Sequence, residues 1–340
     1  MHPEAPIDGL LHSACAAIRF RSATEILGLD RNRAELREAQ AQILKADPVR
    51  RLLAQQRPDG WLGPRFHGYD SHEGGVRILA EMGVPADHPP FSAALQVVEQ
   101  QAARIEAELG RVGRALDDGG FGGSRMMRAA ALAHAGLEGN ALVREQIQVA
   151  LEGFGAVVEA ESIEAISEPY RGKRFFRPGV RWPGIYHLRL LAHTRSWRSP
   201  EAHGLMTQAA TRLAALSPIP PILVRVHSQW IAPPSFAMQD FDTDLATMDP
   251  PQWMMWFHRM ELLARLGLAW DIPALARQVS RLGEVLQAGD GWFALPLSHE
   301  YFARWGAYTG LRLEPDWKSP ARRQYDLTFR SLLILHDSGG

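Results

Sequence analysis

The sequence predicts an all-α protein, and three observations lead to this prediction. Short helical segments with a Leu-Leu-Ala-like centre recur along the chain, each after a loop rich in glycine or aromatic residues. Helix-capping residues flank several of them, and the alternating pattern of β-strands is nearly absent. The five centres are Ile78-Leu79-Ala80, Ala131-Leu132-Ala133, Leu190-Leu191-Ala192, Leu262-Leu263-Ala264 and Leu332-Leu333-Ile334. A recurring unit of this kind indicates a repeat architecture, in which each unit packs against its neighbours.

Capping residues predict where several helices end and begin. Gly83, Gly136 and Gly267 each close a helical segment, where a left-handed cap is expected. Three other helices are predicted to begin with a side-chain acceptor at the N-cap and proline at the first helical position. These pairs are Ser199-Pro200, Asp249-Pro250 and Ser319-Pro320.

Further helical stretches lie between the repeats, so the helices are predicted to come in pairs. In residues 91–112 the apolar residues recur at helical spacing, whereas the best strand signal, ILVRVH at 222–227, alternates only briefly. Five to six helix pairs, by the count of repeats, could stack as an open solenoid or close into a ring. The glycine-aromatic loops favour the ring, because glycine allows close backbone approach around one mouth and aromatic side chains line a cavity. We therefore expect an α/α toroid of inner and outer helices over residues 45–340, with a helical segment, residues 1–44, packed on it.

The composition excludes several classes of protein. With 340 residues, 46% of them hydrophobic and 22% charged, the chain matches an ordinary globular protein. The 37 Lys and Arg residues face 38 Asp and Glu residues, so no basic excess favours nucleic acid as a partner. Cys15 is the only cysteine, which excludes an intramolecular disulfide framework and a multi-thiolate zinc site.

The sequence also gives no targeting or membrane signal. The first 20 residues have no basic residue before their apolar stretch, and His12 and Ser13 interrupt that stretch before a cleavage site could follow. No apolar run approaches the roughly 18 to 20 residues that a membrane-spanning helix needs. We therefore expect a cytoplasmic protein without stable membrane insertion.

Three loops resemble the glycine-aromatic repeats of the terpenoid cyclase and protein prenyltransferase superfamily. They are QRPDGW at residues 56–61, DGGFGG at residues 118–123 and GDGWF at residues 289–293. Members of that superfamily are built on an α/α toroid, so the resemblance implies this fold across roughly residues 45–335. Its prenyltransferase β subunits hold a catalytic zinc with an aspartate, a cysteine and a histidine. Cys15 lies outside every repeat, so we expect neither a metal nor a cofactor.

An acidic motif suggests a catalytic acid. The squalene-type cyclases protonate an isoprenoid with the middle aspartate of an Asp-x-Asp-Asp motif, and this chain has a similar run at residues 240–244, with its third acid one position late. Carboxylates this close repel one another, which raises at least one pKa where they are partly buried and keeps a proton to donate. The resemblance implies Asp242 as the acid, tuned by Asp240 and Asp244. The alternative is a solvated acidic loop.

The loop at residues 66–75 carries the richest chemistry. It gathers two imidazoles, a phenol and two carboxylates, a set suited to acid-base catalysis or metal ligation. Asp70 and His72 are the candidate catalytic residues here. The alternative for the two carboxylates is a capping box, in which Asp70 accepts from the first helical turn and Glu73 reaches back.

Aromatic side chains are predicted to line the central cavity and bind the substrate, either by stabilising a cation with their ring faces or by contact alone. Packing in the core is the alternative for any one of them. The candidate substrate-binding residues are Trp61, Tyr69, Trp182, Tyr186, His187, Trp253, Trp256 and Trp292. Arg177 and Arg181 precede the helix that contains Tyr186, where they could bind an anion or pair with nearby glutamates.

The preferred hypothesis is a cyclase-like or isomerase-like enzyme that uses acid catalysis on a small apolar ligand of isoprenoid type. A carbohydrate-active toroid, a lyase or hydrolase, is the alternative enzyme, because indole rings also stack on sugars and Tyr69, Asp70 and His72 could act as acid or base. A third possibility is a non-catalytic toroid that binds a ligand.

Overall fold

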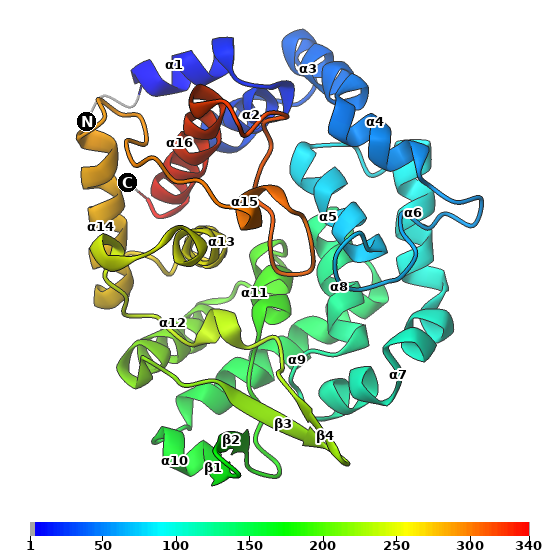
Figure 1. The fold of residues 1–340 in the computed structure, drawn as a ribbon, viewed down its shortest axis with the longest axis vertical. Helices are drawn as coiled ribbons and strands as arrows, with labels where there is room; N and C mark the ends of the chain where they lie inside the picture. The colour runs from blue at the N-terminus through cyan, green and yellow to red at the C-terminus, as the bar shows by residue number, and fades with distance from the viewer. Residues whose placement is uncertain (1–3, 340) are drawn as a thin grey trace. The chain divides into compact units, whose positions relative to one another are not determined.

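The computed structural model describes residues 4–339 and is mostly helical, with helix over 59% of the described residues (Figure 1). This content agrees with the predicted all-α class. The ends of the two predicted segments, residues 1–3 and residue 340, lie outside the described residues. The α-helices are α1 (Glu4–Ser13), α2 (Ala16–Arg21), α3 (Ala34–Lys45), α4 (Asp47–Ala54), α5 (His72–Met82), α6 (Pro89–Gln100), α7 (Ala102–Asp118), α8 (Ser124–His134), α9 (Ala141–Val158), α10 (Ile163–Ile166), α11 (Ile185–Ala192), α12 (Pro200–Leu216), α13 (Pro250–Arg265), α14 (Pro273–Gln287), α15 (Glu300–Ala303) and α16 (Pro320–Asp337). Shorter turns are the π-helical η1 (Ser22–Ile26) and the 3-10 helices η2 (Phe236–Met238) and η3 (Leu245–Thr247).

The helices begin and end where the capping residues predict. Ser199, Asp249 and Ser319 each accept a hydrogen bond from the backbone N–H three residues later, and proline follows each of them. Left-handed glycines stand at the three predicted ends, Gly83 (φ 83°), Gly136 (φ 82°) and Gly267 (φ 76°). The predicted helix over residues 91–112 is divided, because α6 ends at Gln100 and α7 begins at Ala102.

The five recurring centres all lie in helices, namely α5, α8, α11, α13 and α16. These helices are buried around most of their circumference, and every residue of α11 is buried. A helix that is buried on all sides has no face for solvent, so its neighbours must cover it. This burial explains why their sequences are apolar over consecutive residues rather than on a single stripe.

The described residues form two compact units, each of which is described by itself. The first unit comes from the described parts of Met1–Val97, Asp244–Gly267 and Arg277–Gly340, and the second from Val98–Thr243 and Leu268–Ala276. The first unit includes α1, α2 and α3, which cover the predicted N-terminal segment, together with α5, α13 and α16. The boundaries between the units fall inside α6 and α14.

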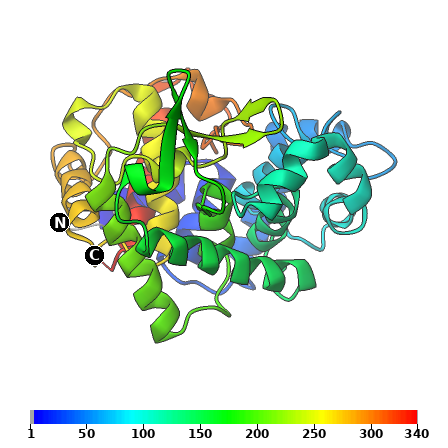
Figure 2. The ribbon, with the colours of Figure 1, turned by 90° about the horizontal axis from the view of Figure 1, so that it is seen from below.

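Within the second unit, helices pack in two rows beside a small sheet. Helix α8 contacts α11, α9 contacts α12, and α9 also contacts both α8 and α11. The sheet has the order β1-β2-β3-β4, with antiparallel hairpins β1-β2 and β3-β4 joined by a parallel pairing of β2 and β3 (Figure 2). The strands are β1 (Ser167–Tyr170), β2 (Lys173–Phe176), β3 (Ile222–Val226) and β4 (Gln229–Ile231).

The all-α prediction does not include this sheet, and only one of its strands has a recognisable signal in the sequence. Strand β3 matches the signal at residues 222–227, whereas the other three are only three or four residues long. Such segments are too short for an alternating pattern to stand out, and Pro169 further weakens the strand signal of β1.

A cluster of buried charges joins the helices of the first unit. Three guanidinium groups and three carboxylates from α2, η1, α5, α13 and α16 make up this buried ion cluster. Its members are Arg21, Glu25, Glu81, Glu261, Arg265 and Arg330. Arg330 Nη1 lies 2.5 Å from Glu261 Oε2, and Arg21 Nη1 lies 2.6 Å from Glu81 Oε2. Because each charge faces several opposite charges, the helices that carry them are fixed relative to one another.

The guanidinium groups keep the carboxylates of the buried ion cluster ionised. Burial alone would raise the pKa of Glu261, but Arg330, followed by Arg21 and Arg265, lowers it, and the net shift is downward. A carboxylate whose pKa falls on folding stabilises the folded state above its unfolded pKa of about 4.3. That contribution is lost as the pH falls through the lower pKa of the folded state.

We expect Glu261→Gln to lower the free energy of unfolding by about 3 to 5 kcal/mol, because it leaves buried guanidinium groups without one of their carboxylates. Urea denaturation at pH 7 measures this change. The matched control is Glu284→Gln, which breaks an exposed pair with Arg281 and should cost less than about 1 kcal/mol. Equal effects of the two substitutions would contradict the role assigned to the cluster.

Candidate functional site

Arg77 of α5 holds one loop segment of the first unit, residues 305–310. The guanidinium group donates to the carbonyl oxygens of Gly306 (3.1 Å) and Thr309 (2.6 Å), and also to those of the residues that follow each of them. It also lies 4.8 Å from the centre of the Trp305 ring, and Arg77 is only 6% exposed. One side chain on α5 therefore fixes the segment 305–310, which follows α15.

The second segment, residues 61–72, is anchored by His72. The backbone N–H of Leu62 donates to His72 Nδ1 (3.0 Å), and His72 Nε2 lies 3.0 Å from the carbonyl oxygen of Ala94. Because Nδ1 accepts a hydrogen bond, the proton of the neutral ring is on Nε2 and is donated to Ala94. The predicted catalytic residue His72 is thus fully buried, with both nitrogens bonded to the backbone.

The start of α5 differs by one residue from the predicted capping box. Ser71 is the N-cap, and its hydroxyl oxygen accepts from the backbone N–H of Gly74 at 3.1 Å. Asp70 is exposed and has a positive φ of 50°. The carboxylate of Glu73 faces the ring of His67.

Glu73, His67 and Tyr308 form a chain of hydrogen bonds, which we call the relay. Glu73 Oε2 lies 2.8 Å from His67 Nδ1, and His67 Nε2 lies 3.3 Å from the hydroxyl oxygen of Tyr308. The side chain of Glu73 is 5% exposed and that of His67 is 24% exposed. A carboxylate next to Nδ1 keeps the proton on that nitrogen, which leaves Nε2 to accept the phenol proton. Glu73, at the buried end of the relay, thus favours proton transfer from Tyr308 to His67 Nε2.

The relay faces a cavity of about 180 Å³. This cavity is lined by His67, Gly68, Tyr69, Ala307, Tyr308 and Thr309. The ring of Tyr69 lies under the guanidinium group of Arg304, 3.9 Å away. A side chain at Gly306 would come within 2.7 Å of the same ring, so glycine is required for Tyr69 to take this place. A neighbouring cavity of about 540 Å³ in the first unit is lined by residues that include Asp70, Arg304 and Trp305.

The other predicted substrate-binding residues of the first unit pack against one another. Trp61 contacts the ring of His72, with ring centres 5.0 Å apart, and Trp253 contacts Trp256 at 5.4 Å. Trp256 Nε1 donates to the side-chain oxygen of a glutamine on α14. Trp292 is half-buried against Tyr325. Of the eight predicted side chains, only Tyr69 lines either of these two cavities.

In the second unit, Trp182, Tyr186 and His187 are also buried in the packed interior. His187 Nδ1 accepts from the backbone N–H of Gly184 at 3.0 Å, and its ring lies under Gly122 of the DGGFGG loop. A side chain at Gly122 would approach His187 to 2.9 Å, and its φ is 83°. The loop thus needs glycine at this position for a packing reason.

The acidic motif lies at the surface. Asp240 is half-buried, whereas Asp242 and Asp244 are exposed. Asp244 caps η3, because its carboxylate accepts from the backbone N–H of Ala246 at 2.9 Å. These positions match the alternative of a solvated acidic loop, and the side chain of Asp242 is exposed to water.

Arg177 and Arg181 pair with carboxylates, as the structural alternative for them predicts. Arg177 Nη1 lies 3.5 Å from Glu168 Oε2, and Arg181 Nη1 lies 2.9 Å from Glu152 Oε2. Pairing between exposed side chains stabilises a protein little, so these contacts position the two arginines more than they add stability.

Sequence reasoning missed Tyr308 and Arg77. His67 and Tyr308 are 241 residues apart, and no local pattern links them. The one available signal is that Tyr308 stands between Gly306 and Gly310, in a segment with other aromatic residues. Arg77 lies within an apolar helical run, where an arginine indicates that it is held by buried acceptors.

Within residues 4–339 no group of three or more His, Cys, Asp or Glu side chains is arranged to hold a metal ion. The same residues include no helix with both the length and the apolar character needed to cross a bilayer. The chain matches no family model, and comparison with curated proteins and with solved structures found no match either.

We expect Arg77→Lys to lower the free energy of unfolding by about 3 kcal/mol, because a single ammonium group cannot reach the carbonyl oxygens that the guanidinium group holds. Trypsin should then cut faster after Arg304, in the released segment. Urea denaturation and timed proteolysis measure the two effects.

The control is Arg304→Lys, whose side chain is exposed and stacks on Tyr69. It keeps a trypsin site and should leave both stability and cleavage rate near the parent values. An Arg77→Lys protein that resists trypsin as the parent does would refute the role given to Arg77.

A second prediction concerns pH. Burial lowers the pKa of His187 to about 4, from 6.5 in the unfolded chain. Between these values the unfolded state binds more protons, so stability should fall as the pH decreases from 6.5 to 4, by up to about 1.4 kcal/mol per unit. His187→Asn keeps an acceptor near Gly184 and should flatten this dependence. Urea denaturation at several pH values measures it, and an unchanged slope in the variant would contradict the assignment.

Proposed function

We propose that the chain is an acid-base enzyme of the lyase or isomerase type, with the relay as its proton-transfer group. The observation that carries this proposal is the ordered chain from buried Glu73 through His67 to Tyr308, the last two of which line a cavity. A buried carboxylate, a ring oriented by it and a polar group at the cavity are the parts that general acid-base catalysis requires.

The proposed step is the removal of a proton from a carbon next to a carbonyl group. The substrate C–H proton passes to Tyr308 Oη while the phenol proton passes to His67 Nε2, and the electron pair of the C–H bond moves toward the carbonyl. Glu73 stabilises the imidazolium ion that forms. Return of a proton to another carbon completes an isomerisation, and loss of a β-substituent completes an elimination. General acid-base catalysis of this kind typically contributes about 10² to 10⁴ to the rate.

The size of the cavity limits its ligand. Its volume is about 180 Å³, and the side chains of His67, Tyr69 and Tyr308 contribute to its lining. Ligand sites for drug-sized molecules begin at about 300 Å³, so the cavity suits a small carbonyl compound or one end of a longer chain. The acidic motif on which the isoprenoid cyclase hypothesis depends is exposed, and this favours an enzyme that uses the relay instead. The likeness to terpenoid cyclases stays a prediction.

We also infer that the helices build an α/α toroid. The contacts of α8, α9, α11 and α12 support it, because α8 contacts α11 as two inner helices would and α9 contacts α12 as two outer helices would. The near-complete burial of α8 and α11 is what an inner position requires.

The proposal is tested by solvent exchange, which needs no knowledge of the final product. The protein is incubated in D₂O with a pool of aldoses, ketoses, uronates and hydroxy acids, and mass spectrometry then detects compounds that gain deuterium at carbon. We expect at least one compound to gain deuterium in the presence of the parent protein. Tyr308→Phe and His67→Gln should each lower the rate of deuterium incorporation at least about 100-fold.

Tyr301→Phe is the matched control, because Tyr301 is exposed in the same part of the first unit but does not line the cavity. The Tyr301→Phe protein should catalyse deuterium incorporation at the same rate as the parent protein. If no compound gains deuterium, or if Tyr308→Phe is as active as Tyr301→Phe, the proposal is refuted.

A further inference from the structure

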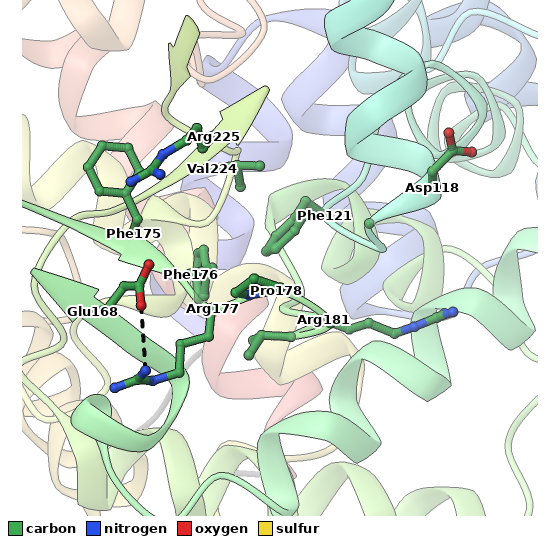
Figure 3. Close-up of a pocket in the computed structure, with 13 residues that line it drawn as sticks. Asp118, Phe121, Glu168, Phe175, Phe176, Arg177, Pro178, Arg181, Val224 and Arg225 are labelled. Atoms are coloured by element: carbon green, nitrogen blue, oxygen red, sulfur yellow. Dashed lines mark ion pairs between the residues drawn. The ribbon is translucent and has the colours of Figure 1, made fainter. Parts of the chain in front are cut away.

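A separate cavity in the second unit combines aromatic rings with guanidinium groups. It has a volume of about 520 Å³, and residues from the DGGFGG loop, from the sheet and from the segment after β2 line it (Figure 3). Phe121 of the loop and Phe176 of β2 face each other, with ring centres 5.0 Å apart. The volume lies in the range of small-molecule sites, and the apolar rings offer a surface for a flat group.

Arg225 differs from the other arginines of this cavity. Figure 3 shows it lying across the ring of Phe175, and its guanidinium carbon is 5.1 Å from the centre of that ring and 4.4 Å from the centre of the Tyr170 ring. Among the described residues, no carboxylate or carbonyl oxygen accepts a hydrogen bond from Arg225, which is exposed. Arg177 and Arg181, by contrast, already face Glu168 and Glu152.

Stacking leaves the binding edge of a guanidinium group available. The N–H bonds lie in the plane of the group, so rings that cover its face restrict its rotation without using its donors. A carboxylate can then accept two parallel hydrogen bonds from that edge. Arg225 is thereby held ready for an anion, and its side chain loses less conformational freedom on binding than a mobile arginine does.

The remaining charges of the cavity do not occupy this edge. Glu168 pairs with Arg177, and Asp118 lies well apart from Arg225 in Figure 3. Of the three lining arginines, Arg177 and Arg181 are each paired with a glutamate, so the positive charge at the edge of Arg225 is not balanced by a neighbouring carboxylate among the described residues. An anionic ligand is therefore favoured over a neutral or cationic one of the same shape.

We propose that this cavity binds an organic anion that consists of a flat ring and a carboxylate. Arg225 holds the carboxylate, and the rings of Phe121, Phe175 and Phe176 contact the flat group. This site is distinct in residues and chemistry from the relay, and it would make the chain a binder of aromatic or similarly flat acids whether or not the relay is catalytic.

The test compares two ligands of nearly equal shape by isothermal titration calorimetry on the full chain. The probes are 2-naphthoate and the neutral 2-naphthalenemethanol. We expect the naphthoate to bind at least about tenfold more tightly, as a charge-assisted hydrogen bond predicts, and added salt to reduce the difference. Arg225→Gln should remove the preference while leaving the affinity for the neutral probe within about twofold.

Arg171→Gln is the matched control, because Arg171 also lies over Tyr170, at 5.2 Å, but does not line the cavity. It should keep the preference for naphthoate, and circular dichroism checks that both variants are folded. Equal binding of the two probes, or a preference that survives Arg225→Gln, would overturn the proposal. A ten-residue thymidine oligonucleotide that binds more tightly than naphthoate and needs Arg225 would also overturn it, because Arg225 and the rings beside it would then serve nucleic acid.

Discussion

The balance of charges inside the buried ion cluster is the constraint on which the first unit depends. Six charged groups from five elements are largely removed from water, and their mutual contacts compensate for much of the lost hydration. Removing one member therefore leaves its partners buried and uncompensated, whereas a matched apolar replacement of the whole cluster would not. The cluster selects one arrangement of α2, η1, α5, α13 and α16, because few others bring opposite charges together.

Helix α5 connects this cluster to the relay. Glu73, Arg77 and Glu81 are spaced four residues apart and so share one face of the helix. Glu73 orients His67, Arg77 holds the segment that contains Tyr308, and Glu81 belongs to the buried ion cluster. The position of α5 thus determines the geometry of the relay, and the ion cluster determines the position of α5. Preorganisation of this kind is what a proton-transfer site needs.

The sequence reveals local structure better than it reveals the site. Caps such as Ser199 and Asp249 act on their own helix, so a short motif is sufficient to predict them. The loop that contains His67 was also predicted to be chemically rich. His72, however, is used for backbone anchoring, and Tyr308 reaches His67 only through the tertiary fold. Residue type alone does not distinguish an anchoring histidine from a reactive one, because burial and partners decide that.

The first unit is assembled from three separate stretches of the chain, so it cannot fold completely until the last of these stretches has been synthesised. The second unit is drawn mainly from one continuous stretch, Val98–Thr243, whereas the first unit needs α16, which the ribosome makes after every other described element of the two units. Until Arg330 leaves the exit tunnel, Glu81 and Glu261 each lack one of their guanidinium partners. The first unit therefore completes its interior only after the second unit has been synthesised. A nascent chain that stops short of α16 keeps its charged helices open to proteases, which lets a cell distinguish truncated from finished copies.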